Sequence, residues 1–180
     1  MPPCFCGARC RAPEDNEMYY CYLETPIGDL LLAGDNAGLA LIGFPEGAMR
    51  RDPEEDWIFN EKPFAKARAQ LSDYFAGKRK TFELDLKPTG TAFQLQVLEE
   101  LQKIPYGETC SYRDIAERIG RPKAVRAVGA ANGRNPIPIV IPCHRVIGAS
   151  GDLTGFGGGL PTKEALLRLE LENSQFQPGS

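Results

Sequence analysis

Three neighbouring residues with reactive or charged side chains, Cys143, His144 and Arg145, follow a proline-fenced apolar run over 135–142. A free thiol has a pKa of about 8.5, so a nucleophilic cysteine needs a nearby base or cation that favours the thiolate. His144 is the single histidine of the chain. Any imidazole that serves Cys143 must therefore come from its immediate neighbour.

The local backbone decides whether this pair can cooperate. Successive side chains of a strand point to opposite faces, so the pair can act together only where the strand ends. Pro142 favours such an end, because it fixes its own φ and lacks an N–H. An imidazole base also needs an acceptor on its second nitrogen, and Glu170 and the other acids of the predicted helix 163–172 are candidates. The residues alone leave open that Cys143 is an inert buried thiol.

The first half of the chain predicts an α/β domain over 18–87, after a tail at 1–17 that has no periodicity. Three short β-type runs between 18 and 44, separated by turn compositions, predict an antiparallel meander. Residues 63–76 predict a helix, and the alternation over 81–86 predicts a half-buried strand. Composition and charge change at 87–91, which indicates a domain boundary.

The second half predicts a mainly helical domain over 88–173, followed by a short tail at 174–180. Thr91 with Gln94, and Ser111 with Asp114, have the spacing of capping boxes that begin two helices. A third helix follows Gly120 at once, and two short helices joined by a glycine turn are typical of a helix-turn-helix unit.

Positive charge is concentrated in this second half, although the net charge of the chain is −3. Residues 1–86 carry ten Lys and Arg against fifteen Asp and Glu, whereas 87–180 carry eleven against nine. Seven basic and two acidic residues lie between 113 and 145, enough local charge to hold a polyanion. The helix over 121–133 is rich in Ala and Gly, with Arg126 projecting, so its partner is either another helix or a nucleic-acid groove. A solvated helix face is the alternative.

The remaining cysteines and the compartment follow from composition. No apolar run could cross a membrane, and the N-terminus lacks the apolar core of a secretory signal. We therefore expect an intracellular protein, in a bacterial cytoplasm or a nucleus, with reduced thiols. Cys4, Cys6, Cys10 and Cys21 could form a zinc site, but their spacing is not that of a standard knuckle, so we expect no metal. Cys110 is interpreted as a small filler residue.

Four linked motifs between 93 and 172, "SYRDIA", "PKAVRAVGAAN", "IPCHRVI" and "GFGGGLPTKEALLRLE", resemble the O6-alkylguanine-DNA alkyltransferases. The resemblance implies a ribonuclease-H-like N-terminal domain packed on a helical, winged-helix-like DNA-binding domain. It also implies repair of duplex DNA by direct reversal. An alkyl group passes irreversibly from O6 of a flipped guanine, and in some members from O4 of thymine, to a cysteine. The protein would act once per molecule and need no cofactor.

The same resemblance assigns roles to individual residues. Cys143 would accept the alkyl group, His144 would take the thiol proton through water, Glu170 would orient His144, and Asn135 would brace the turn above the site. The residues expected to contact the flipped base are Tyr112, Val146, Phe156 and Gly157, together with the backbone of Cys143. Those expected to contact the duplex are Arg126, which would fill the space left by the base, and the phosphate-binding Gln94, Arg113, Arg121 and Ala149. Gly157 replaces a serine of several members, which predicts a roomier pocket.

The expected partner is double-stranded DNA containing alkylated bases, bound by a monomer that could load cooperatively, with no role for a membrane. Three other functions remain open at this point. A lesion-binding relative without repair activity would lack the acceptor thiol, and a helix-turn-helix regulator would need neither the thiol nor the glycine loop. A cysteine hydrolase would turn over.

Overall fold

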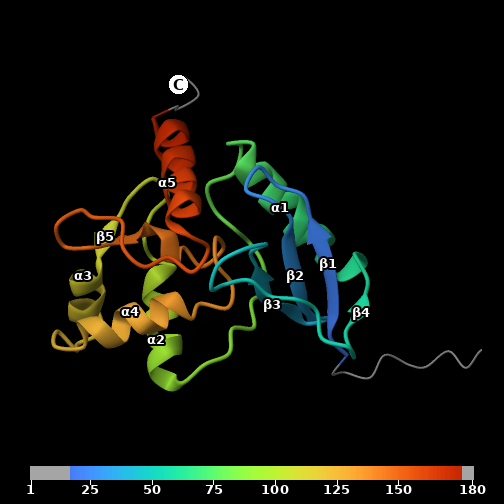
Figure 1. The fold of residues 1–180 in the computed structure, drawn as a ribbon, viewed down its shortest axis with the longest axis horizontal. Helices are drawn as coiled ribbons and strands as arrows, with labels where there is room; N and C mark the ends of the chain where they lie inside the picture. Colours follow the sequence, from blue (N-terminus) through green and yellow to red (C-terminus); the bar gives the residue numbers. More distant parts are fainter. Residues whose placement is uncertain (1–16, 176–180) are drawn as a thin grey trace, which may run out of the picture.

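The computed structural model describes residues 17–175, which form two halves side by side (Figure 1). The N-terminal half is a sheet covered by one long helix, and the C-terminal half is a group of helices around the segment that carries Cys143. The strands of the N-terminal sheet lie in the order β3-β2-β1-β4. Their bounds are β1 Tyr19–Leu23, β2 Leu30–Asp35, β3 Gly38–Gly43 and β4 Ile58–Phe59.

The predicted antiparallel meander is confirmed for β1, β2 and β3, but the sheet as a whole is mixed. β4 pairs parallel with β1, since the chain crosses from β3 through the charged loop 50–56 and returns along the opposite edge. The Ile58 N–H donates to the Met18 carbonyl at 2.9 Å. The prediction of a purely antiparallel sheet was therefore wrong. Two exposed residues carry too little alternation to predict this edge strand.

The helix predicted over 63–76 is confirmed as a 3₁₀ turn, η1 Lys62–Phe64, that continues into α1 Ala65–Phe75. It ends at Gly77, whose φ of +73° suits a glycine at the C′ position. The Lys78 N–H donates back to the Asp73 carbonyl at 2.9 Å, which closes the helix end. The face that α1 turns toward the interior includes the fully buried Tyr74, which matters for the site below.

The strand predicted over 81–86 is wrong: only Leu86 forms an isolated bridge, with Leu39. The backbone of this segment bonds to Leu39 of β3 at one point, where the Leu39 N–H donates to the Asp85 carbonyl at 2.9 Å, and otherwise to side chains. Gln70 of α1 donates its amide to the Glu83 carbonyl at 3.2 Å and accepts from the Glu83 N–H at 2.9 Å. The predicted alternation of half-buried and exposed side chains is nevertheless present. The alternating burial of these side chains was predicted correctly. The hydrogen bonds of Glu83 with Gln70 were not, because no local pattern links a strand to a side chain of the preceding helix.

The C-terminal half contains four α-helices and a short two-stranded parallel ladder. Both predicted capping boxes are confirmed, at Thr91 with Gln94 and at Ser111 with Asp114. The elements are α2 Ala92–Leu101, β5 Cys110–Ser111, α3 Tyr112–Arg118, α4 Val125–Gly133, η2 Cys143–Arg145, β6 Val146–Ile147 and α5 Leu160–Ser174.

α3 and α4 pack on each other and are joined by a sharp reversal at Gly120, whose φ is +73°. α4 packs against α2 and α3 and buries Val128, Ala131 and Asn132. Arg126 and Ala127 are exposed on its other side. The small residues of α4 therefore serve two surfaces, one inside the domain and one open to a partner. No helix within 17–175 is long and apolar enough to cross a membrane.

Replacing Gln70 with Ala should lower the free energy of unfolding by about 1–3 kcal/mol, because Glu83 would lose both partners of its backbone groups. Urea unfolding followed by circular dichroism measures this change. Gln96→Ala, at an exposed position of α2, is the matched control and should cost far less. Equal unfolding midpoints for the two variants would contradict the role given to Gln70.

Candidate active site

The reactive residues lie at the predicted end of the apolar run. After Pro142 the chain forms the 3₁₀ turn η2, and this places Cys143 and His144 in a tight turn instead of on opposite faces of a strand. Both side chains are fully buried. The Cys143 N–H donates to the Ile141 carbonyl at 2.8 Å, which holds the turn against the preceding segment.

Asn135 braces the segment that leads into this turn, as predicted from the resemblance. Its amide donates to the Ile141 carbonyl at 2.8 Å and accepts from the Ile137 N–H at 3.0 Å. Within this loop Ile139 has a φ of +73°, a conformation that β-branched residues rarely adopt. The Ile139 backbone and the Asn135 side chain both favour the thiolate of Cys143 and act to lower its pKa. The strained backbone thus directs a donor toward the sulfur.

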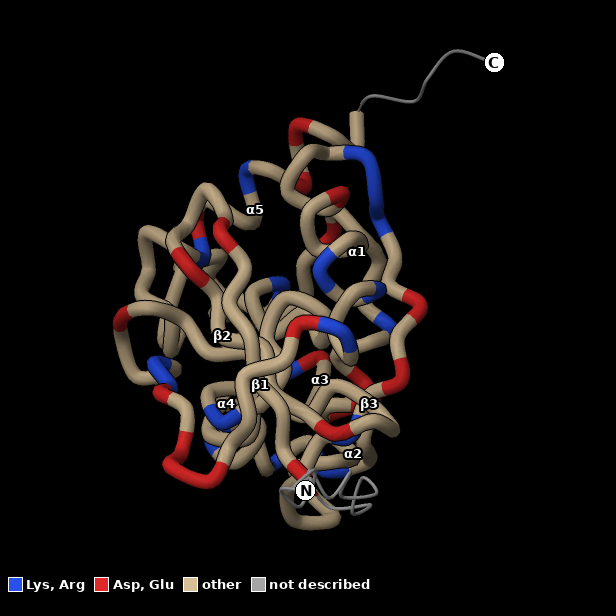
Figure 2. Tube along the Cα trace, turned by 90° about the vertical axis from the view of Figure 1, so that its right-hand side faces the viewer, with Lys and Arg blue, Asp and Glu red and all other residues tan. Residues whose placement is uncertain are grey.

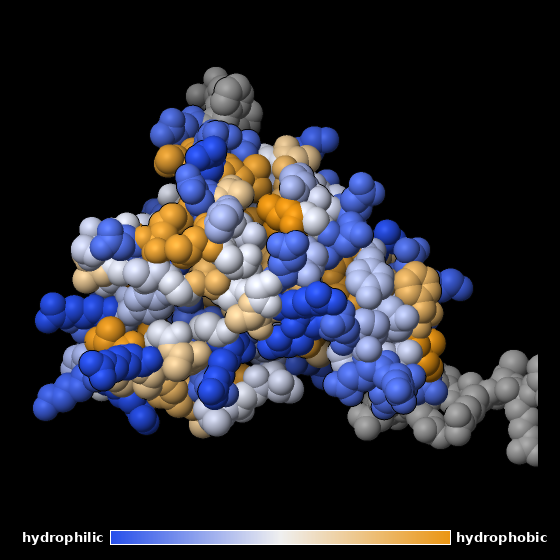
Figure 3. Space-filling view, in the orientation of Figure 1, coloured by the Kyte–Doolittle hydropathy of each residue, from blue (hydrophilic) through white to orange (hydrophobic). Residues whose placement is uncertain are grey.

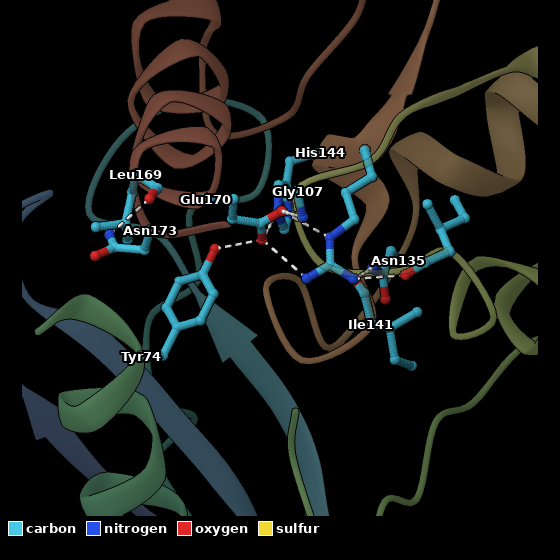
Figure 4. A network of polar contacts seen from close by, with 10 residues as sticks. Tyr74, Gly107, Asn135, Ile141, His144, Leu169, Glu170 and Asn173 are labelled. Carbon is cyan, nitrogen blue, oxygen red and sulfur yellow. Dashed lines mark hydrogen bonds and ion pairs between the residues drawn. The ribbon is translucent and has the colours of Figure 1, made fainter. Parts of the chain in front are cut away.

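Glu170 of α5 is the centre of the polar network of the site (Figure 4). One carboxylate oxygen, Oε1, accepts from His144 Nε2 at 2.6 Å, from the Tyr74 hydroxyl at 2.7 Å and from the Arg145 guanidinium at 2.9 Å. The other oxygen, Oε2, accepts from Arg145 Nε at 2.8 Å and from the Gly107 N–H at 3.2 Å. Glu170, one of the acids predicted as a partner of His144, is therefore the acid that contacts it.

These bonds hold the pKa of Glu170 at about 2, although burial of the carboxylate acts in the opposite direction. The carboxylate is ionised at every pH at which the protein would work. Since its pKa is lower than the ordinary 4.5, the network stabilises the fold above that pH. The stabilisation is lost as the pH falls toward 2.

Two members of this network were missed from the sequence. Arg145 was noted only as a residue able to hold a charge, yet it is 6% exposed and also donates to the Ile104 carbonyl at 2.7 Å. Tyr74 lies within the helix predicted over 63–76, and nothing in that pattern gave it a role in the site. Its hydroxyl crosses from the N-terminal half to the acid of the C-terminal half. No sequence spacing links positions 74 and 170, so only the packing of the two halves reveals this contact.

The neighbours of His144 set its tautomer. Because Glu170 is ionised, Nε2 must carry the hydrogen and Nδ1 keeps its lone pair. Nδ1 makes no hydrogen bond to the part of the chain that the structure describes. Burial lowers the pKa of His144 from 6.5, and the cations of Arg145 and Lys163 lower it further, while Glu170 raises it. The imidazole is neutral at pH 7, with Nδ1 able to accept a proton.

Burial raises the pKa of the Cys143 thiol to about 11, in spite of the positive charge of Lys163 nearby. The resting sulfur is therefore protonated at neutral pH. Lys163, at the start of α5, is fully buried and donates to the carbonyls of Val146 at 2.6 Å and Thr154 at 3.1 Å. This buried cation was also missed, because a lysine in a helical pattern ordinarily indicates a solvent face.

Tyr112 and Lys163 both hold the glycine-rich loop at the carbonyl of Thr154. The Tyr112 hydroxyl donates to the Thr154 carbonyl at 3.1 Å, and burial raises the pKa of this phenol. Lys163 lies over the Tyr112 ring at 6.0 Å. Phe156 is buried in the same core as Cys143. Tyr112 and Lys163 therefore meet at the Thr154 carbonyl near Cys143. Burial lowers the pKa of Lys163, whereas a thiolate at Cys143 acts to raise the pKa of both groups.

Two details qualify the roles expected for this region. The carbonyls of Cys143 and Val146 already accept from Asn132 at 3.3 Å and from Lys163 at 2.6 Å, so a base amino group would use a second lone pair. The roomier pocket predicted from Gly157 stays a prediction, although the space beside this glycine is not empty. A Cβ built on Gly157 would lie 2.3 Å from Cγ of Met49, so that space is filled.

The residues predicted to touch the duplex lie apart from this centre, on the surface. Strongly hydrophilic side chains project at the lower left of the molecule, where α3 and α4 lie (Figure 3). Gln94 is half-buried and held in its capping box, and Arg121 lies over the Phe93 ring at 5.5 Å. The exposed members of the predicted set are Arg113, Arg121, Arg126 and Ala149.

Acidic residues are frequent along the loops of the N-terminal half, toward which Figure 2 looks. The basic residues of α3 and α4 lie in the other half. Within residues 17–175 no group of three or more His, Cys, Asp or Glu side chains could hold a metal ion. Cys21 is fully buried in the sheet, and Cys110 is buried as the filler residue expected. Cys4, Cys6 and Cys10 lie outside the described residues.

Comparisons with known proteins match both halves. Residues 18–88 match the family model of the 6-O-methylguanine DNA methyltransferase ribonuclease-like domain. Residues 92–172 match that of its DNA binding domain. A methylated-DNA–protein-cysteine methyltransferase of Methanosarcina acetivorans is 54% identical over 153 residues, which are 85% of this chain and 98% of that protein.

Solved structures agree with these matches. The Mycobacterium tuberculosis O6-methylguanine methyltransferase has a TM-score of 0.82 at 46% identity, over 91% of this chain and 96% of its own. The structure of Mycobacterium tuberculosis OGT in complex with DNA has a TM-score of 0.81 at 48% identity, over 86% of this chain and 94% of its own. The chain belongs to the 6-O-methylguanine DNA methyltransferase family, with its ribonuclease-like N-terminal domain and its DNA-binding domain.

Proposed function

We propose that the protein repairs duplex DNA by moving the alkyl group of O6-alkylguanine irreversibly to Cys143, once per molecule. The observation that carries this proposal is the buried sulfur of Cys143 next to a neutral His144 whose second nitrogen is held by an ionised Glu170. The names of the relatives, and the relative solved with DNA, support the same reaction.

The first step is loss of the thiol proton. The Cys143 thiol is protonated at rest, so His144 Nδ1 takes the proton, through a bridging water as the resemblance implies. Glu170 then stabilises the imidazolium and keeps its ring in place. Lys163 and the donors around the sulfur favour the thiolate that forms. Burial keeps the thiol protonated until a substrate arrives.

The second step is alkyl transfer. The thiolate attacks the alkyl carbon, a sulfur–carbon bond forms, and the bond from that carbon to O6 breaks with its electron pair left on the base. The proton held by His144 returns to the guanine, which leaves as the normal base. The thioether cannot be hydrolysed by any group of this site, so the protein is consumed in the reaction.

DNA engages the face formed by α3 and α4, which we infer to be a helix-turn-helix unit. The duplex hides O6 of guanine, so the base must be flipped into the site, at a cost of a few kcal/mol. Arg126 is exposed on α4 beside small residues, which suits its insertion into the space left by the base. Tyr112 lies at the start of α3, where its hydroxyl can move from the Thr154 carbonyl to the base.

Phosphate contacts supply affinity without sequence preference. We assign them to Gln94, Arg113, Arg121 and Ala149, of which the two arginines carry the charge. Repair of O4-alkylthymine, action as a monomer, cooperative loading on DNA and an intracellular location are further parts of this proposal.

Incubation with duplex DNA containing O6-methylguanine, followed by intact-protein mass spectrometry, tests the function. One methyl group should be added at Cys143 and no more, with an equal amount of normal guanine formed. Cys143→Ser should gain nothing, whereas Cys110→Ser should react like the parent. Repeated turnover would indicate a hydrolase, and binding without a mass change would indicate a regulator or a lesion sensor.

Replacing Tyr74 with Phe should slow methyl transfer at pH 7 and move the acid limb of its pH–rate profile to higher pH. Without the phenol as a donor, Glu170 interacts more strongly with His144 and raises the pKa of the imidazole. Protonation of His144, which abolishes its role as a base, would then occur at higher pH. Single-turnover rates between pH 5 and 8 measure the shift.

Tyr106→Phe is the matched control, since this ring packs on Tyr74 at 6.1 Å and its hydroxyl makes no hydrogen bond within the described residues. Its profile should stay at the parental position. Equal displacement of both profiles, or of neither, would remove Tyr74 from the positioning of the base.

Replacing Arg126 with Ala should lower the transfer rate from duplex DNA by roughly tenfold or more, because the cost of flipping is a few kcal/mol and the inserted side chain offsets it. Transfer from a lesion in a single-stranded oligonucleotide should change far less. Arg168→Ala, in the exposed part of α5, is the control. A uniform loss on both substrates would contradict a role in flipping.

A further inference from the structure

We propose that Met49, a residue of the N-terminal domain, forms part of the wall of the pocket that receives the alkylated base and limits the size of the adduct that the protein accepts. The inference rests on the function proposed above and extends it to substrate selection. None of the residues expected from the resemblance to touch the base lies in the N-terminal domain.

The backbone of Met49 is bonded to the pocket loop. Met49 follows β3 in the loop 44–50 and is 3% exposed. Its N–H donates to the Gly157 carbonyl at 2.8 Å, and its own carbonyl accepts from the Phe44 N–H at 3.1 Å. The first bond fixes the main chain of Met49 against the loop of the C-terminal domain, and the second closes its own loop on Phe44.

The side chain of Met49 occupies the space next to Gly157. A Cβ on Gly157 would lie 2.3 Å from Cγ, 3.0 Å from Sδ and 3.2 Å from Cε of Met49. All three outer atoms of the thioether chain therefore lie where a side chain at position 157 would begin. The space beside the glycine is not empty, because a residue of the other domain supplies the missing bulk.

The residues on either side of Gly157 are supported in the same way. The rings of Phe44 and Phe156 meet edge to face at 5.6 Å. A Cβ on Gly158 would lie 2.8 Å from the Phe156 ring and 3.0 Å from the Phe44 ring. Phe44 and Met49 thus back three consecutive residues of the pocket loop.

This loop is part of the reactive centre, since the Thr154 carbonyl binds both Tyr112 and the buried Lys163. Methionine has three flexible side-chain bonds and adapts to the shape of its neighbours. Met49 can therefore move partly aside for a larger adduct, but its volume remains in the wall. Removing it should favour large adducts over small ones.

The test compares single-turnover transfer rates for O6-benzylguanine and O6-methylguanine in the same duplex. Met49→Ala should raise the benzyl-to-methyl ratio roughly three- to tenfold, within the range that one or two methylene groups give in an apolar pocket. Met49→Leu, which conserves volume, should keep the ratio near that of the parent. Met18→Ala is the matched control, a methionine that precedes β1.

A coupled pair of variants tests the contact itself. Gly157→Ser should slow both transfers, because the new side chain meets Met49, and adding Met49→Ala should restore most of the loss. Thermal melting verifies folding, and Met49→Val replaces Met49→Ala in both comparisons if the alanine variant does not fold. An unchanged ratio together with no rescue of Gly157→Ser overturns the inference. A parent protein that transfers no methyl group overturns the proposed function instead.

Discussion

The buried carboxylate of Glu170 is the constraint on which the rest of the site depends. A carboxylate without partners in the interior would cost several kcal/mol or take up a proton. Here it accepts five hydrogen bonds, two of them from the guanidinium of Arg145. The side chains of Tyr74, Arg145 and His144 are therefore held in place by hydrogen bonds to one anion. The position of the base relative to the sulfur follows from that arrangement.

The same constraint ties the two domains together at the point of reaction. Tyr74 reaches Glu170 from α1, and Met49 reaches Gly157 from the loop after β3. The β3 backbone adds a third link, where the Ile42 N–H donates to the Pro136 carbonyl at 2.9 Å next to the Asn135 turn. The ribonuclease-like domain carries none of the residues that react, yet it contacts the acid, the pocket loop and the brace of the reactive turn. It is therefore a structural part of the active site.

Patterns within short segments predicted much of this protein. Capping boxes at Thr91 and Ser111, glycine stops and apolar spacing located the main helices, and the motif around Cys143 located the reactive turn. Features that depend on contacts between distant segments could not be predicted in this way. The hydrogen bonds of Gln70 replaced a strand over 81–86, and β4 joined the sheet by a return of the chain. The Tyr74 hydroxyl reached Glu170 of the other half, and Lys163 was buried against ordinary expectation.

The balance of buried charge explains why such a site can hold a thiol at rest and still use it as a nucleophile. Arg145 and Lys163 are cations and Glu170 is an anion, so the fixed charges leave one positive charge in excess. A thiolate at Cys143 would neutralise that excess, whereas burial acts the other way and the thiol pKa remains raised, at about 11. The two effects oppose each other, and proton transfer to His144 through the bridging water proposed above decides between them. A sulfur kept protonated until a substrate fills the site is spared from reaction with other electrophiles, which matters for a protein that can react only once.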